Sequence, residues 1–428
     1  MYYVAATIRS SEEWALEVRE QGAFSLWALG GQIKSQQRYV AECFGIPHIV
    51  TMLLSKSEKL QYVSLNAVIA LADESEPNQN RLYRENILAP LIRLLKHYHQ
   101  LSHRVLLVLV QSFSVLCVGV SLTPNTLLQN AIVEHNAISM IIRLMESTQH
   151  VDLKVECCLS LAKLVLNNSA NQKQLSNDFN IADVVVRFSE INESDLKLRA
   201  LLALSLFAYN NLENQCIFKD TNKISYDSFR TFIDSSNTTY SALACFQVSK
   251  YISSLARVRT GISDGFVSCQ VLERLIEKLY TLSPPATSED AGDEVEMHST
   301  CAIAIGALSY NKTAFRLLYN LVRRDPTLYD KIVECGQRSC MSPEFVKFFE
   351  SERVNGLPVD SLSLHLRVLE SRSASSAHRR STFSDRKTPS RIETANSHLR
   401  IQTTSVCSTI PSIQNKRHLR LSSKLSHT

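Results

Sequence analysis

A helical phrase recurs along this chain about every 43 residues. Its copies are AFSLWALGGQIKSQQ ending at Gln37, NAVIALADESEPNQN ending at Asn80, LSLAKLVLNNSANQ ending at Gln172 and LALSLFAYNNLENQ ending at Gln215. The first two ends have the same separation as the last two, whereas Asn80 and Gln172 are more than twice as far apart, which leaves room for two repeats and a short insertion. A period of about 40 to 47 residues is typical of stacked helical repeats. The chain is therefore predicted to fold as an array of helical units.

Each repeat has the same internal order, which is clearest in residues 42–80. A Gly-Ile-Pro start leads into the apolar run IVTMLL, and a polar break, SKSEK, separates this run from a longer helix. That helix carries Val63, Ala67, Ala70 and Leu71 on one face, the i, i+4, i+7, i+8 spacing of an amphipathic helix. The IVTMLL phrase recurs as LIRLL (91–95), IIRLM (141–145), VVRFS (185–189), FRTFI (229–233) and LIEKL (275–279).

These phrases resemble the armadillo-repeat family over roughly residues 1–335. The repeat that starts at Glu42 is the most specific part, and the copies between 216 and 335 are the least regular. The resemblance implies an all-α fold: an armadillo/HEAT-like right-handed α-solenoid superhelix of three-helix units, whose long third helices line a groove. It also implies a non-enzymatic scaffold that binds another protein.

The two ends of the repeat region predict its boundaries. Residues 1–31 supply only a second and a third helix, so about seven units are expected in residues 1–335, with the first one incomplete. The stacking face of that unit would be uncovered, so we expect either that an upstream segment is missing or that the sequence is a truncated isoform or gene model. At the other end, two phrases resemble one branch of the armadillo-repeat family: TAFRLLYNLVRRDPTLYDKIVECG and MSPEFVKFFESERVNGLP. Capping helices are predicted over residues 336–370.

Armadillo proteins of the importin and catenin kind hold extended peptides with a ladder of Asn and Trp side chains on their third helices, and this chain lacks that ladder. The corresponding Asn positions are Ala28, Ala70, Lys163, Leu206 and Ala307, together with Cys117, and the Trp positions are Phe24, Asn66, Leu159, Leu202 and Ile303. Without a row of amides to pair with a peptide backbone, importin-like binding of cargo is not expected.

Amphipathic residues nevertheless remain near the predicted groove. They are Trp27, Lys163, Tyr209, Asn210, Tyr310 and Asn311. These side chains are candidates for contact with a partner. The alternative is that they cap helices and pack between repeats, because Asn favours helix C-termini. The expected partner is another protein of unknown identity, with no specific nucleic acid, and the chain is expected to be a monomer.

Cysteine usage and the N-terminus predict a cytoplasmic protein. The eleven cysteines are odd in number and lack paired spacings, which suits reduced, buried thiols better than a disulfide framework. The N-terminus has no basic stretch followed by an apolar core, so no secretory signal is predicted. The chain also lacks G-x4-G-K-S/T, G-x-S-x-G, H-E-x-x-H and G-x-G-x-x-G motifs. No catalytic residue, metal or cofactor is therefore expected.

An alternative hypothesis is a membrane-associated protein. The run from Val105 to Leu122 contains no charged residue, and its length reaches the lower limit for a membrane-spanning helix. However, this run lies where a third helix is expected, contains Gln111 and several serines, and has no basic flank. A third helix that is covered by its neighbours can be apolar nearly all round. Contact of the basic C-terminal segment with anionic lipid is the other route to a membrane.

Two clusters of polar residues invite a site hypothesis. His97, His99 and His103 form H-x-H-x3-H in the unit with the insertion, and three imidazoles could bind Zn²⁺. Because residues i and i+2 lie on different sides of a helix, solvated histidines are the favoured interpretation. The run SEDAGDEVE (288–296) carries five carboxylates and is expected in a solvated loop of the last repeat.

The composition changes from about Ser371 onward. Residues 371–428 are rich in Lys, Arg, Ser and Thr and contain few Asp or Glu, whereas the net charge of the whole chain is only +5. Such a segment buries too little apolar surface to offset chain entropy, so residues 371–428 are predicted to be a disordered basic tail. Thr382 follows an Arg pair and Thr388 precedes Pro389, so both are candidate phosphorylation sites.

Overall fold

The computed structural model describes residues 15–31, 33–252, 261–281, 291–325, 327–335 and 341–347. The predicted tail, with Thr382 and Thr388, lies outside the described residues, and so does most of the predicted capping region 336–370. The chain divides into two compact parts, each made of several repeats, with a boundary between Phe207 and Ala208. We call these parts the first unit and the second unit.

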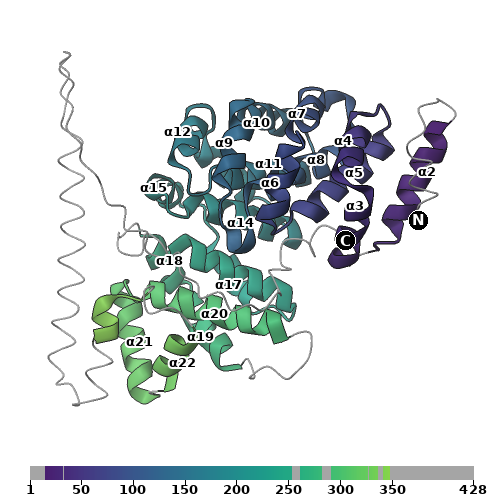
Figure 1. The fold of residues 1–428 in the computed structure, drawn as a ribbon. Helices are drawn as coiled ribbons and strands as arrows, with labels where there is room; N and C mark the ends of the chain where they lie inside the picture. The colour runs from purple at the N-terminus through teal and green to yellow at the C-terminus, as the bar shows by residue number, and fades with distance from the viewer. Residues whose placement is uncertain are drawn as a thin grey trace, which may run out of the picture. The chain divides into compact units, whose positions relative to one another are not determined.

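The described residues fold into helices, with no strand and with one isolated bridge between Val118 and Pro124 (Figure 1). The apolar phrases of the sequence repeat fall in the middle helix of each group of three. This arrangement of short first and second helices and a longer third helix confirms the predicted all-α armadillo-type solenoid.

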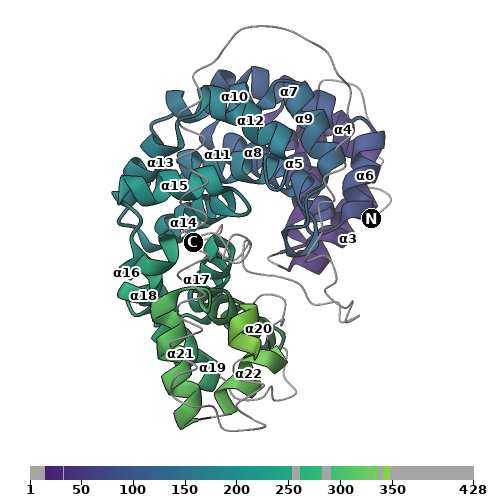
Figure 2. The same cartoon turned by 90° about the vertical axis from the view of Figure 1, so that its left-hand side faces the viewer.

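The described part of the first unit contains one long helix, α2 (Ala15–Ala28), followed by groups of three helices. The groups are α3 (Lys34–Phe44), α4 (Ile46–Leu54) and α5 (Glu58–Ala72); α6 (Glu76–Arg84), α7 (Leu88–Lys96) and α8 (His103–Cys117); α9 (Thr126–Glu134), α10 (Ala137–Ser147) and α11 (Val151–Leu164); and α12 (Ser169–Asp178), α13 (Ile181–Ser189) and α14 (Ser194–Ala208). The helices α2, α5, α8 and α11 pack in chain order, each against the next. Figure 2 shows α5, α8 and α11 side by side.

Local sequence sets the turns between these helices. Gly45 adopts a φ of +74°, which a residue with a side chain rarely adopts, and this lets α4 start directly after α3 with Pro47 in its first turn. Asn86 and Asn136 each adopt a φ of +58° just before α7 and α10, a left-handed conformation that Asn tolerates. Ser57 caps α5 by accepting a hydrogen bond from the backbone N–H of Leu60.

The apolar run 105–122 does not form one continuous helix. Helix α8 ends at Cys117, and the chain then forms the bridge from Val118 to Pro124 around a 3₁₀ turn at Val120–Leu122. Most apolar side chains of α8, including Leu109 and Phe113, are buried in the solenoid. No helix among the described residues has the length and apolar character that crossing a membrane requires.

The second unit contains further helices of the same kind. They are α15 (Leu212–Thr221), α16 (Tyr226–Ile233), α17 (Thr238–Ile252), α18 (Ile262–Ser268), α19 (Val271–Thr281), α20 (Ala291–Leu308), α21 (Lys312–Arg324) and α22 (Thr327–Cys335).

The acidic run of residues 288–296 was predicted to lie in a loop. This prediction is partly wrong, because α20 begins at Ala291 and residues 291–296 are helical. Residues 288–290 lie outside the described residues.

Candidate partner-binding groove

A hollow of about 690 Å³ lies in the first unit and is lined by α2, the start of α3, α5 and α8. We call it the α2–α5–α8 groove and define it by its lining. The lining residues are Phe24, Trp27, Ala28, Gly31, Lys34, Gln37, Arg38, Tyr62, Asn66, Ile69, Ala70, Asp73, Arg104, Leu107, Val108 and Gln111. Three successive third helices thus contribute side chains to one surface, as the repeat pattern predicts.

One wall of the groove is a stack of flat groups. The rings of Phe24 and Tyr62 lie nearly parallel, at 14°, with their centroids 6.4 Å apart. The guanidinium of Arg104 lies over the Tyr62 ring, with its central carbon 3.9 Å from the ring centroid. A cation over an aromatic face is attracted by the ring's quadrupole. Helices α2, α5 and α8 are therefore joined by a preformed surface that is both apolar and positively charged.

The other wall is held by polar contacts at the C-terminal end of α5. The ammonium of Lys34 lies 2.7 Å from a carboxylate oxygen of Asp73. Arg38 donates hydrogen bonds to the carbonyl oxygens of Ala70 and Asp73, at 3.0 and 2.6 Å. Carbonyls at a helix C-terminus have no partner within the helix and carry partial negative charge, so a guanidinium is favourable there.

The groove is positive overall. Its charged lining residues are the cations Lys34, Arg38 and Arg104 and a single carboxylate, Asp73. Asp73 pairs with Lys34, whereas the other two cations contact backbone carbonyls and an aromatic ring. Two of the three positive charges therefore have no carboxylate among the groove residues.

Of the residues predicted from sequence, Trp27 lines the groove. Lys163 lies on α11 and is buried, with 7% of its surface exposed. Burial lowers the pKa of its ammonium, and the negative charge of Asp73 opposes that shift.

The other four predicted residues belong to the second unit. Asn210 follows α14 in a left-handed conformation, with a φ of +55°, and the ammonium of Lys250 lies 4.8 Å from the centroid of the Tyr209 ring. Tyr310 donates a hydrogen bond to the carbonyl oxygen of Met341, and Asn311 caps α21. These contacts are those of helix ends and of packing, the alternative that the sequence left open. A role for these residues at a partner surface stays a prediction.

Sequence reasoning did not select Tyr62, Arg38 or Arg104 for the groove. The comparison with the Asn and Trp ladder considers only two positions in each third helix. In α2 and α5 the Trp positions are those of Phe24 and Asn66. Arg104 lies in the first turn of α8, far from both tested positions. No repeated sequence position marks this contact, because Phe24 corresponds to Asn66 in the next repeat and not to Tyr62.

The three histidines singled out by sequence do not gather. A ring nitrogen of His97 contacts the carbonyl oxygen of Arg93, at 2.9 Å, and the His99 ring meets Tyr98 edge-on. His103 instead contacts residues of the next repeat. The spacing H-x-H-x3-H is therefore not a cluster in space.

Comparison with known proteins was made by sequence and by fold. No protein-family model matches the chain. The mouse ankyrin and armadillo repeat-containing protein is 34% identical over 370 residues, which cover 77% of this chain and 24% of the relative. Its human counterpart is 34% identical over 321 residues, which cover 65% of this chain and 21% of the relative. The chain thus spans about a quarter of the length of these relatives.

Solved structures with a similar fold include two designed proteins. The designed armadillo repeat protein YIII(Dq)4CqI has 15% sequence identity and a TM-score of 0.45, and the match covers 58% of this chain and 98% of that chain. The designed protein YIII(Dq.V1)4CPAF, solved in complex with the peptide (KR)4, has a TM-score of 0.44 at 15% identity, with the same coverage of both chains.

The fold of the described residues is that of an armadillo-type solenoid. Over the matched residues the chain is similar to the ankyrin and armadillo repeat-containing protein of mouse and human, in agreement with the resemblance that its closing phrases predicted.

Proposed function

We propose that the chain is a non-enzymatic scaffold and that its α2–α5–α8 groove holds an extended segment of another protein. The observation that carries this proposal is the guanidinium of Arg104 over the ring of Tyr62, beside Phe24. A stack of rings and a cation that is already ordered loses little side-chain entropy when a partner binds. Aromatic and arginine side chains are also the types enriched where binding energy concentrates.

The charges of the groove select the kind of segment. Arg38 and Arg104 have no carboxylate among the groove residues, so an Asp or Glu of the partner gains attraction there, whereas a Lys or Arg is repelled. The lining also includes the apolar side chains of Ile69, Leu107 and Val108. The partner segment is therefore one that combines acidic residues with an aromatic or branched aliphatic residue. The volume of about 690 Å³ lies within the range of about 300 to 1,000 Å³ common for binding pockets.

Selection of peptides from a random displayed library on the full chain tests this proposal. We expect the bound pool to be enriched in Asp and Glu next to Trp, Phe, Leu or Ile. The affinity of a selected peptide, measured by fluorescence anisotropy, should fall by about tenfold or more in Arg104→Glu, because a favourable charge becomes a repulsive one. Trp27→Ala should also weaken binding, because it removes apolar contact area.

Arg143→Glu is the matched control. Arg143 is an exposed arginine of the same unit, lies on α10 and does not line the groove. Reversal of its charge changes the net charge by the same amount and should leave the affinity nearly unchanged. A pool enriched in Lys and Arg, or equal losses in Arg104→Glu and Arg143→Glu, would contradict the proposal.

A further inference from the structure

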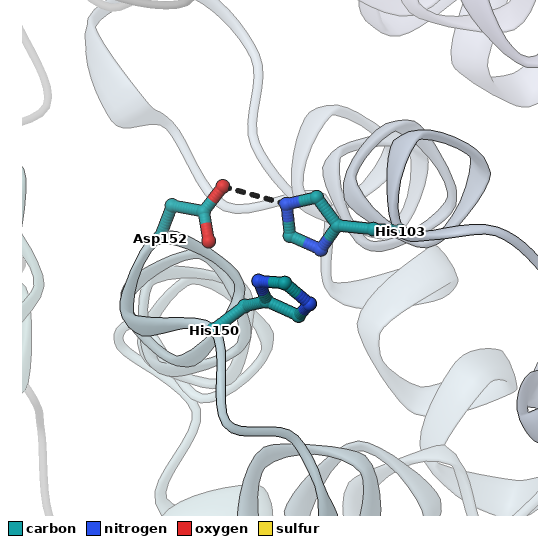
Figure 3. A group of neighbouring side chains, drawn as sticks. All are labelled: His103, His150 and Asp152. Atoms are coloured by element: carbon teal, nitrogen blue, oxygen red, sulfur yellow. Dashed lines mark hydrogen bonds and ion pairs between the residues drawn. The ribbon is translucent and has the colours of Figure 1, made fainter.

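His103, His150 and Asp152 lie together where two third helices begin (Figure 3). His103 is the first residue of α8, His150 precedes α11, and Asp152 is in the first turn of α11. Nε2 of His103 lies 2.8 Å from a carboxylate oxygen of Asp152. The two imidazole rings are 4.1 Å apart between centroids and inclined by 32°.

The spacing of the three groups is close to that of a metal site. One ligand atom from each residue lies within 4.8 Å of the others. Zn²⁺ binds imidazole nitrogen and carboxylate oxygen at about 2.0 to 2.2 Å, so the ligand atoms of a tetrahedral site lie about 3.3 Å apart. Side-chain rotation on metal binding must therefore bring the ligand atoms closer together than they lie here. His103 and Asp152 each keep about a third of their side-chain surface exposed, which gives an ion a path to the site.

The contacts present do not use the full bonding capacity of the His103 ring. Its Nε2 meets the carboxylate of Asp152, whereas its Nδ1 is buried and has no hydrogen-bond partner among the described residues. Figure 3 shows this second nitrogen on the side of the ring that faces His150. An imidazole with one buried and unsatisfied nitrogen, stacked on a second imidazole, is an arrangement that a bound cation would complete.

Both a carboxylate and a guanidinium lie near the cluster. Glu58 accepts a hydrogen bond from the backbone N–H of Ser102, next to His103. Arg199 is near Asp152, but its guanidinium pairs with Glu156 on α11. The carboxylate of Asp152 is thus not committed to that guanidinium and can serve a metal ion.

We propose that His103, His150 and Asp152 form a binding site for a transition-metal dication of the Zn²⁺ class. Two imidazoles and one carboxylate suit Zn²⁺ and its neighbours Co²⁺ and Ni²⁺, whereas Mg²⁺ and Ca²⁺ prefer oxygen ligands alone. Three protein ligands leave one coordination position for water or for a group of a partner. The ion links the start of α8 to the start of α11, and so joins two successive repeats beside Arg104, which lines the α2–α5–α8 groove.

Metal titration of the full chain tests the site. The protein is first stripped with a chelator and kept reduced with a phosphine. Zn²⁺ binding is then followed by calorimetry, and Co²⁺ binding by the visible absorption that tetrahedral Co²⁺ gives. We expect wild type to bind one equivalent more than His150→Ala or Asp152→Asn. We also expect Zn²⁺ to raise the thermal unfolding midpoint of wild type and to leave the midpoints of those variants in place, because a ligand stabilises only the state that binds it.

The double variant His97→Ala/His99→Ala is the control. It removes two imidazoles from the same stretch of sequence, neither of which belongs to the cluster, and should keep the wild-type equivalent. All the proteins contain the same cysteines, so thiol binding cancels in the comparison. If circular dichroism shows that His150→Ala is unfolded, Asp152→Asn gives the same comparison with a nearly isosteric change. Equal stoichiometry and equal midpoint shifts in wild type and in the folded variants would overturn the proposal.

Discussion

The side-chain amide nitrogen of Gln79 lies 2.7 Å from the carbonyl oxygen of Val118, just past the end of α8. The same nitrogen lies 2.8 Å from the carbonyl of Val115 and 3.0 Å from that of Ala72, the last residue of α5. Carbonyls at helix C-termini lack partners within the helix. Gln79, on the first helix of its repeat, therefore satisfies the ends of two successive third helices at once.

The second unit repeats this contact. The amide nitrogen of Gln215 donates to the carbonyls of Ala208 and Tyr251, at 3.0 and 3.2 Å. Gln79 and Gln215 are the glutamines of the recurring NQ in the sequence phrase, and each bonds the carbonyl seven residues before it. The recurring phrase thus supplies a glutamine that bonds the C-terminal ends of successive third helices, among them α5 and α8, which line the groove.

Replacement of Gln79 by Leu should destabilise the first unit by about 2 to 4 kcal/mol, because several buried carbonyls lose their donor while the side-chain volume is kept. Urea unfolding followed by circular dichroism measures this loss. Gln36→Leu, an exposed glutamine on α3, is the control and should change the free energy of unfolding by less than about 0.5 kcal/mol. Equal effects of the two substitutions would contradict the bridging role.

Much of the fold follows from the sequence, because helices and their order depend on local patterns. The run IVTMLL and its five later copies all lie in second helices, from α4 to α19. Each copy is an apolar stripe bounded by turn residues, and such a stripe forms a helix wherever a neighbour covers it.

The sites were less predictable, because their residues meet across repeats. Arg104 lies over Tyr62 of the preceding repeat, and His103 contacts Asp152 of the following repeat. The period can be read from the sequence, but which side chains meet between neighbours cannot, since this depends on the rotation of each helix about its axis. From the sequence, solvated histidines were the favoured interpretation of His97, His99 and His103, and the partners of His103 in the next repeat could not be seen.

Arg199→Met should destabilise the first unit by about 3 to 5 kcal/mol, because it leaves the carboxylate of Glu156 buried without its cation. The double variant Glu156→Leu/Arg199→Met should recover most of this loss, since no uncompensated charge remains. Denaturant unfolding of wild type, both single variants and the double variant gives the coupling energy. Additive losses would show that the two residues act independently, and the exposed Arg143→Met serves as the surface control.

Acid should loosen the contact between α2 and α5. A hydrogen bond from Ser57, aided by Lys59, holds the pKa of Glu20 below its ordinary value of 4.5. Because the folded-state pKa is the lower one, Glu20 stabilises the fold above about pH 4.5, and this contribution is lost as the pH falls through the folded pKa. The change in unfolding midpoint between neutral pH and about pH 3 should therefore be smaller in Glu20→Gln than in wild type. Glu17→Gln, an exposed position on the same helix, should behave as wild type, and a flat wild-type profile would refute the prediction.

The salt dependence of peptide affinity should distinguish the contribution of the groove's positive charge to binding from that of its apolar surface. Raising NaCl from about 0.05 to 0.5 M shortens the screening length severalfold and should weaken the binding of an acidic peptide to wild type. Arg104→Lys keeps the charge but loses the planar group over Tyr62, so we expect lower affinity with an unchanged salt dependence. Trp27→Ala should also lower the affinity without changing its salt dependence, whereas Arg104→Ala should make the affinity less dependent on salt.

Anisotropy titrations at four salt concentrations measure this salt dependence. If the wild-type affinity does not change with salt, the positive charge of the groove does not select the partner, and binding rests on the rings of Phe24, Trp27 and Tyr62.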